Sequence, residues 1–454
     1  MFVEYHAANG AIYKIKEERM ARGGEGSIHE IENMPNFVAK IFRKNKCSSA
    51  REEKIGKMVL NKAPEGVLRC VAWPLDVLYD ENGFAGYVMK RVKCSASLSE
   101  LYSDSKYDLL VRTYAAYNLC AAVEEIHNMG QVCGDLNPRN ICINLDRKDR
   151  DVYKVTLVDT DSYHFIADES VYRCEVGLAE YLAPELQQKI SGEVTLKNAP
   201  LPTFTRETDL FALAVHVFCL LMNGSHPFAC AKKANGKTSN TMEQMAGGEV
   251  RESVAAPQPI ENIKSGFFPF YHKGENIDIP AYAPEFTSLH PNIQRLFVQT
   301  FVEGDREPER RVQAAEWLAA LKPIIEDFEN IKNQCVKGHL YFAHNRSCPY
   351  CYVIQKKIAV LKEIEEQNNI PPLPPEQLSG NVSGSGGNGT GGVPWSGGFP
   401  LPPPKKKANR NAVVQAIAVI LIIVIFVPFL WLILLYLFEE DTFARILDAL
   451  RYVI

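Results

Sequence analysis

Residues 132–141 read VCGDLNPRNI, and this stretch decides how the rest of the chain is interpreted. It places the carboxylate of Asp135 five residues before the amide of Asn140. Phosphoryl transfer to a hydroxyl group uses such a pair, because the carboxylate accepts the hydroxyl proton and the amide oxygen holds Mg²⁺. The spacing therefore predicts a phosphotransfer site in this loop.

Segments upstream of the loop supply candidate phosphate-binding groups. Residues 22–28 read RGGEGSI, and closely spaced glycines let a backbone turn approach phosphates, although a plain Gly-rich hairpin has the same pattern. Lys40 lies in the apolar run FVAKIF, as on a strand that aims one ammonium at an anion. An edge-strand lysine that reaches solvent is the alternative. Residues 51–58 read REEKIGKM and predict a helix on which Glu53, or as second choice Glu52, pairs with Lys40. A solvated acid on the outer face of that helix is the alternative.

Further motifs follow downstream in a consistent order. The apolar segment 155–158 ends at Asp159, which would present a second carboxylate to a metal ion. Residues 177–185 read GLAEYLAPE, Asp209 opens an apolar helix, and Arg311 stands just before another predicted helix.

With these motifs in this order, residues 10–325 resemble the eukaryotic-type (Hanks-type) serine/threonine protein kinase domain in its divergent bacterial form. The resemblance implies an α+β, bilobal protein-kinase-like fold, with the N-lobe at residues 10–90 and the C-lobe at residues 91–325. It implies transfer of the γ-phosphate of ATP to Ser or Thr hydroxyls, with Mg²⁺ or Mn²⁺ as cofactor. The implied partners are protein substrates, the chain itself among the candidates, and a PP2C-like phosphatase.

The resemblance also assigns roles to individual residues. Asp135 would be the catalytic base, and Asn140 and Asp159 would hold the metal ion. Lys40 would contact the α- and β-phosphates, with Glu53 holding its ammonium in place. The residues expected around the nucleotide are Arg22, Gly23, Gly24, Glu25, Gly26, Ser27, Ile28, Ala39, Lys40, Glu53, Met89 and Cys142.

Three more residues are expected to hold the C-lobe together. By the resemblance, Glu185 and Arg311 form a buried ion pair. Asp209 begins the helix that anchors the catalytic loop.

Several residues depart from the family pattern. Gly134 stands where an Arg usually precedes the catalytic Asp, and residues 160–161 read TD where FG is usual. Asn137 occupies the catalytic-loop position of the Lys that usually meets the γ-phosphate. Because every position that must carry charge or metal is filled, we predict an active enzyme. The alternatives are an ATP-binding pseudokinase scaffold and a kinase-fold phosphotransferase acting on a lipid or small molecule.

A second chemical signal follows the kinase-like region, within residues 330–366. Cys335 and His339 are followed by the pair Cys348 and Cys351, and three thiolates with one imidazole suit tetrahedral Zn²⁺. So short a segment cannot build its own hydrophobic core, so we expect a structural zinc-ribbon-like module. His344 competes with His339 as the fourth ligand, and a redox-active Cys-x-x-Cys is the alternative to a metal site.

The last part of the chain predicts a tether. Residues 367–411 are rich in Pro, Gly and Ser, end in basic residues, and predict a flexible linker. Residues 412–438 contain no charge, and about 20 apolar residues suffice to span a bilayer. Basic residues before this span and acidic residues after it place the kinase-like region in the cytoplasm and residues 439–454 outside. We therefore expect a single-pass protein of the inner or plasma membrane.

Composition agrees with these expectations. The 454 residues carry a net charge of −4, which argues against a nucleic-acid partner. The 12 cysteines are scattered along the chain and favour a reducing cytosol.

Overall fold

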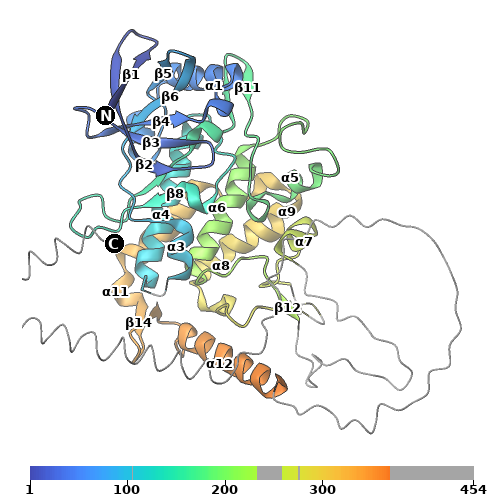
Figure 1. Cartoon of the computed structure of the whole chain (residues 1–454). Helices are drawn as coiled ribbons and strands as arrows, with labels where there is room; N and C mark the ends of the chain where they lie inside the picture. The colour runs from blue at the N-terminus through green and yellow to red at the C-terminus, as the bar shows by residue number, and fades with distance from the viewer. Residues whose placement is uncertain (105, 233–257, 273, 275–276, 369–454) are drawn as a thin grey trace, which may run out of the picture. The chain divides into compact units, whose positions relative to one another are not determined.

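The N-terminal lobe is an antiparallel barrel with strand order β1-β2-β3-β4-β6-β5 (Figure 1). The structure is a computed structural model, which describes residues 1–104, 106–232, 258–272, 274 and 277–368. Apolar side chains fill the barrel from one face of each strand, because successive side chains point to opposite faces. The strands are β1 (Phe2–Ala7), β2 (Ile12–Arg22), β3 (Gly26–Ile31), β4 (Phe37–Phe42), β5 (Asp76–Asp80) and β6 (Gly83–Lys90).

Helix α1 (Ser49–Leu60) lies against strands β5 and β6 of the barrel. Ser48 caps its start, because the hydroxyl oxygen accepts a hydrogen bond from the backbone N–H of Arg51. Ile55 and Met58 are fully buried, and they define the face of α1 that looks into the protein. The short helix α2 (Glu65–Cys70) follows.

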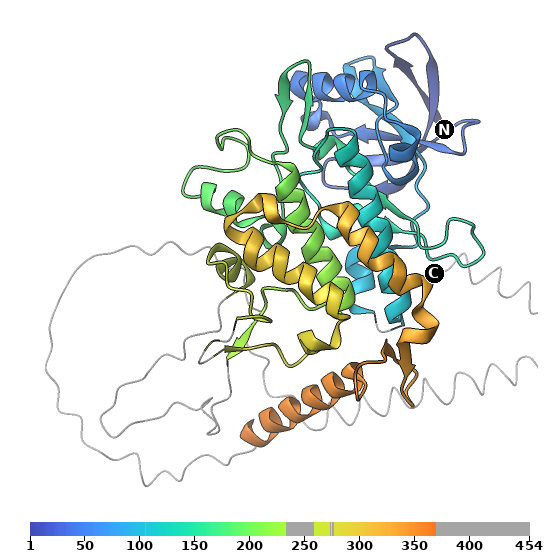
Figure 2. The same ribbon diagram turned by 180° about the vertical axis from the view of Figure 1, so that it is seen from behind.

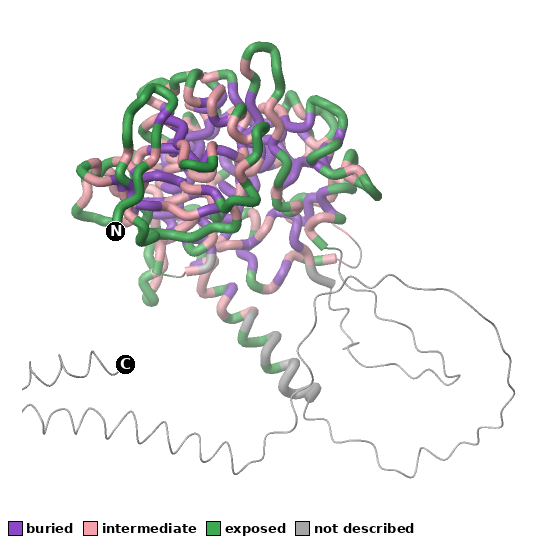
Figure 3. The backbone as a smooth tube through the Cα atoms, turned by 45° about the horizontal axis from the view of Figure 1, so that its top comes forward, coloured by how far each residue is buried: buried purple, intermediate pink, exposed green. Residues whose placement is uncertain are grey.

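The C-terminal lobe is organised around three helices, α4 (Leu109–Asn128), α6 (Arg206–Leu221) and α10 (Ala314–Glu326). Helix α4 packs against both α6 and α10 (Figure 2). Nearly all of α6 is buried, so it forms the centre of this lobe. Figure 3 shows buried segments inside the folded part of the chain and exposed segments around its outside. The other elements are β7 (Ala96–Ser97), α3 (Leu98–Ser103), β8 (Ile141–Ile143), β9 (Val155–Leu157), β10 (Phe165–Ala167), β11 (Ser170–Tyr172), α5 (Pro184–Lys189), β12 (Ala231–Lys232), α7 (Pro259–Lys264), β13 (Ile277–Asp278), α8 (Pro291–Val298) and α9 (Gly304–Arg306).

A buried ion pair joins α5 to the segment before α10. The guanidinium of Arg311, with no exposed side-chain surface, donates two hydrogen bonds of 2.7 Å to the carboxylate of Glu185. The same guanidinium donates to the carbonyl oxygens of Gly304 and Glu207, each at 2.9 Å. The two residues therefore form the pair that the resemblance implied.

The segment after α10 continues onto the C-terminal lobe. It contains α11 (Phe328–Ile331), the hairpin β14 (Lys332–Gln334) and β15 (Leu340–Phe342), and α12 (Pro349–Asn368). Phe342 is buried in the main core, and Asn345 and His344 donate hydrogen bonds to the carbonyl oxygens of Ser288 and Thr287. The predicted module at residues 330–366 thus shares its core with the lobe.

The predicted tether falls outside the described residues. The structure describes nothing from residue 369 onward, which includes most of the linker, the span at 412–438 and the tail at 439–454. Among the residues it does describe, none of the helices is long and apolar enough to cross a membrane.

We expect Arg311→Ala to destabilise the protein by about 3 kcal/mol, because it leaves the Glu185 carboxylate without its buried partner. The matched control is Arg310→Ala, since the Arg310 side chain is 53% exposed and its ion pairs should contribute below about 1 kcal/mol. Urea unfolding of the full chain measures both. Equal changes in the free energy of unfolding for the two variants would show that the buried pair stabilises the protein no more than an exposed pair does.

Candidate active site

The loop between α4 and β8 is held by Asp209 from the start of α6. Its carboxylate accepts hydrogen bonds from the backbone N–H groups of Cys133, at 2.7 Å, and Gly134, at 2.9 Å. His127 of α4 lies 3.1 Å from the same carboxylate. Asp209 therefore fixes the backbone just before Asp135, as the resemblance implied.

Gly134 cannot be exchanged for a residue with a side chain. Its φ of +77° lies in the left-handed region, and a Cβ atom there would meet the Cβ of Cys174 at 2.9 Å. The Arg that usually precedes the catalytic Asp would have no room at this position. The glycine at position 134, where the family usually has arginine, is therefore required by the packing of the loop.

Asp135 and Asn140 lie next to each other. The side-chain Nδ2 of Asn140 is 3.5 Å from an oxygen of Asp135. Burial, and secondarily the negative charge of Asp159, raise the pKa of Asp135 to about 6. A carboxylate with a raised pKa is a stronger proton acceptor. The structure therefore brings together a suitable general base and a candidate metal ligand.

Asn137 shapes the loop. Its side-chain oxygen accepts a hydrogen bond of 3.0 Å from the backbone N–H of Arg139. This contact caps the short helical turn Pro138–Asn140.

Lys40 of β4 lies opposite two carboxylates. Its ammonium forms ion pairs with Asp159 and, at 2.5 Å, with Asp161. Burial would lower the pKa of Lys40, but the two negative charges outweigh this effect and raise it. Lys40 is therefore a buried cation held by the segment after β9.

The predicted pairing of Glu53 with Lys40 is wrong. Glu53 lies on the exposed side of α1, and its carboxylate accepts a hydrogen bond of 2.8 Å from the hydroxyl of Tyr172. An α-helix turns about 100° per residue, so Glu53 points away from the buried Ile55. Glu52, the second choice, interacts with Tyr79 of β5.

The glycine-rich segment forms the turn between β2 and β3, with Arg22 opposite Ser27 and Ile28 opposite Lys40 on β4. Its end is closed by a hydrogen bond of 2.9 Å from the N–H of Gly23 to the carbonyl of Gly26. A Cβ at Gly26 would come within 2.4 Å of the carbonyl oxygen of Ile41, so packing against β4 requires glycine there.

The tip of this turn is tied to helix α1. The carboxylate of Glu25 accepts two hydrogen bonds, of 2.9 and 3.0 Å, from the guanidinium of Arg51. A Cβ at Gly24 would meet nothing within 4 Å, so packing does not require glycine at the tip.

The other predicted nucleotide contacts lie on strands of the two lobes. Ala39 is fully buried inside the barrel, and Met89 is buried near the end of β6. Cys142 is half-buried on β8, where a hydrogen bond with Cys94 and burial raise the pKa of Cys142.

The segment Asp159–Ser162 adopts a constrained conformation. Asp159 has φ 61° and ψ 38°, a left-handed conformation that costs a non-glycine residue of order 1–3 kcal/mol and is concentrated at functional sites. The hydroxyl of Thr160 donates to the carbonyl of Ala72 at 2.9 Å, and that of Ser162 donates to the carbonyl of Asp159 at 2.8 Å. These bonds fix both carboxylates opposite Lys40.

Our reading of the sequence missed Asp161 and Tyr87. The hydroxyl of Tyr87 on β6 donates a hydrogen bond of 2.9 Å to Asp161, whose side chain is 1% exposed. A signal existed, because an acid two residues after Asp159 stands where glycine is usual.

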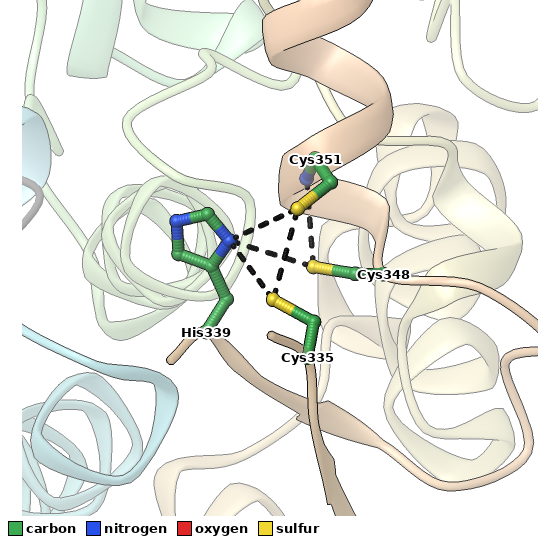
Figure 4. Close-up of side chains that lie close together, drawn as sticks. All are labelled: Cys335, His339, Cys348 and Cys351. Carbon is green, nitrogen blue, oxygen red and sulfur yellow. Dashed lines mark hydrogen bonds between the residues drawn. The ribbon is translucent and has the colours of Figure 1, made fainter. Parts of the chain in front are cut away.

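A separate cluster of three cysteines and one histidine lies between the β14–β15 hairpin and α12 (Figure 4). The Nδ1 atom of His339 is 3.5, 3.6 and 3.4 Å from the sulfurs of Cys335, Cys348 and Cys351. The sulfurs of Cys335 and Cys351 are 3.7 Å apart. Tetrahedral Zn²⁺ requires ligand separations of about 3.6 Å for N and S and about 3.8 Å for two S atoms, so the cluster fits this ion. His344 instead bonds Thr287, which favours His339 as the fourth ligand.

No family model matches this chain. The chain is 25% identical over 366 residues to "Protein kinase YegI" of Escherichia coli strain K12, a match that covers 77% of this chain and 50% of that protein. It is 24% identical over 209 residues to "Ovarian-specific serine/threonine-protein kinase Lok" of Drosophila melanogaster, covering 44% of this chain and 41% of that one. The chain thus spans about half, or less, of the length of these curated relatives.

Among solved structures, the autoinhibited serine kinase domain of the giant muscle protein titin matches with 18% identity and a TM-score of 0.47, covering 76% of this chain and 87% of that one. The sequence matches relate this chain to proteins named as protein kinases.

Proposed function

We propose that this chain is an ATP-dependent protein kinase that phosphorylates Ser or Thr hydroxyls. The observation that carries the proposal is the meeting of Asp135 and Asn140 with Asp159 and Lys40 at one site. The relatives named as protein kinases support the same class of reaction.

Each of these side chains has a role in the proposed reaction. The hydroxyl oxygen of the substrate attacks the γ-phosphorus while Asp135 accepts the hydroxyl proton. ADP leaves with the electrons of the broken P–O bond. Lys40 binds the α- and β-phosphates, and Asn140 and Asp159 are the side chains that would hold Mg²⁺. The metal ion, when bound, neutralises charge on the phosphates. Asn137 contributes by holding the loop in shape, since its side-chain oxygen caps the turn.

A second candidate is an ATP-binding scaffold without phosphotransfer. Asn137 cannot supply the positive charge that a lysine would bring to the γ-phosphate, and a single electrostatic donor is worth roughly 10²–10³ in rate. The placement of the Asn140 amide 3.5 Å from the Asp135 carboxylate favours the catalytic alternative, because phosphotransfer uses these two groups together.

We also propose that the apolar segment 412–438 tethers the kinase to the inner or plasma membrane from its cytoplasmic side, for a role in signalling. A PP2C-like phosphatase that opposes it is a further part of this proposal. Both rest on sequence pattern and on the family resemblance.

We expect Asp135→Asn to lower phosphotransfer by about 10²- to 10⁴-fold, because the amide cannot accept the hydroxyl proton. The full chain is incubated with Mg²⁺, γ-labelled ATP and protein substrates, and label is counted separately in protein and in organic extract. Glu81→Gln, at an exposed turn between β5 and β6, is the matched control and should keep wild-type activity.

Equal labelling of protein by wild type and Asp135→Asn would contradict the proposed base. Label in the organic extract alone would show that the substrate is a lipid and not a protein. Nucleotide binding without any label would support the scaffold.

We further propose that Cys335, His339, Cys348 and Cys351 hold a structural Zn²⁺. All four positions of a tetrahedron are filled by protein side chains, which is typical of a structural zinc site. The ion would join the β14–β15 hairpin to α12 beside Phe342, which is buried in the main core.

We expect about one Zn²⁺ per purified full-length chain, and we expect Cys351→Ser to lose this metal and to melt at a lower temperature. Metal content is measured by mass spectrometry and melting by circular dichroism. Cys47→Ser, which changes a thiol outside the cluster, is the control and should keep the metal. Equal zinc content in the two variants would rule out the site.

A further inference from the structure

Helix α1 does not supply an acid to Lys40 in this structure. Its inward face presents two bases, Arg51 and Lys54. The guanidinium of Arg51 is engaged by Glu25 and lies 4.7 Å from the centre of the Phe42 ring. The ammonium of Lys54 donates a hydrogen bond of 2.9 Å to the carbonyl of Arg173, and burial lowers its pKa to about 8. Lys54 stands one turn before the buried Met58, on the side of the helix that faces the site.

The resemblance expects a glutamate of this helix to hold the phosphate-binding lysine. In this chain a lysine stands on the inward face of α1, and the acids Glu52 and Glu53 are engaged by tyrosines. A buried ammonium still requires a counter-charge, because an unpaired buried charge is costly.

Asp161 meets this requirement. Its Oδ1 atom lies 2.5 Å from the ammonium of Lys40 and accepts a second hydrogen bond, of 2.9 Å, from the hydroxyl of Tyr87. The preceding residue, Thr160, is fixed by its bond to the carbonyl of Ala72. The carboxylate is thus clamped from β4, from β6 and from its own segment.

The two carboxylates on Lys40 differ in their exposure. The side chain of Asp159 is 39% exposed and can turn to a metal ion, whereas that of Asp161 is 1% exposed. When Asp159 serves the metal, Asp161 remains the partner of Lys40.

We propose that Asp161 is the positioning residue for Lys40, in the role that the resemblance gives to a glutamate of helix α1. This inference rests on the proposed function, since it presumes that Lys40 binds ATP phosphates. It follows that the lysine is held ready whatever the position of α1. A switch that works by moving α1 would therefore have no ion pair to make or break.

The arrangement suggests a charge-exchange test. Lys54 is close enough to Asp161 for their charges to interact, so a glutamate at position 54 would face the same region. If Asp161 acts by holding Lys40, a glutamate at position 54 of α1 should restore part of the MgATP binding that is lost when Asp161 is replaced.

The experiment compares full-length wild type with Asp161→Asn, Lys54→Glu, the double variant of both, and Glu53→Gln. Binding of MgATP is measured by calorimetry, and kcat and KM by phosphotransfer. Asp161→Asn should weaken MgATP binding and kcat/KM about 10- to 100-fold, the value of a charged hydrogen bond. Lys54→Glu in that background should recover at least threefold. Glu53→Gln should stay within twofold of wild type, because Glu53 bonds Tyr172 and does not contact Lys40.

A second comparison separates positioning from folding. In a Lys40→Met background, Asp161→Asn should cause no further loss of MgATP binding, because its effect passes through the lysine. A loss of equal size in both backgrounds would show that Asp161 is merely structural and would overturn the inference, as would Asp161→Asn binding MgATP like wild type.

The binding arm also distinguishes this inference from the proposed function. A wild type that binds MgATP without transferring phosphate contradicts the kinase but still tests Asp161 through affinity. A wild type that binds no MgATP overturns both.

Discussion

A positive charge buried between two lobes must be matched by a negative charge, and this constraint organises the candidate site. Lys40 lies on a barrel strand with its ammonium inside the protein. The carboxylates that match it come from a segment 119 and 121 residues later in the chain. The pair therefore joins the N-terminal barrel to the segment that would carry the metal ligand.

The departures from the family pattern fit one another around this pair. Thr160 replaces an aromatic residue and bonds to Ala72, which presents Asp161 to the lysine. With the acid supplied there, helix α1 can carry Lys54 on its inward face. Gly134 packs against Cys174 and leaves no room for the arginine that is usual at this position. Together these changes describe a site in which the carboxylates that hold Lys40 come from the segment after β9 and not from helix α1.

The sequence predicted the parts of the site that depend on local spacing. Asp135 and Asn140 lie five residues apart on one loop, so their meeting followed from short-range geometry. The same holds for the cysteines and histidine of the candidate zinc site, which lie on one hairpin and the start of one helix. The partner of Lys40 could not be predicted from local spacing, because choosing between acids of α1 required knowing how that helix is rotated. That rotation is set by Ile55 and Met58, which bury themselves in a core contributed by distant segments. Asp161 carries a local signal, an acid where glycine is usual, but that signal does not name its partner, which lies 121 residues away in the chain.

The most direct test of this account is an experimental structure of the full chain with Mg²⁺ and a non-hydrolysable ATP analogue. The account predicts that Asp159 leaves Lys40 for the metal, while Asp161 stays within hydrogen-bonding distance of the ammonium and Lys54 keeps its place on the inward face of α1. A structure in which α1 turns and Glu52 or Glu53 reaches Lys40, with Asp161 released, would contradict it.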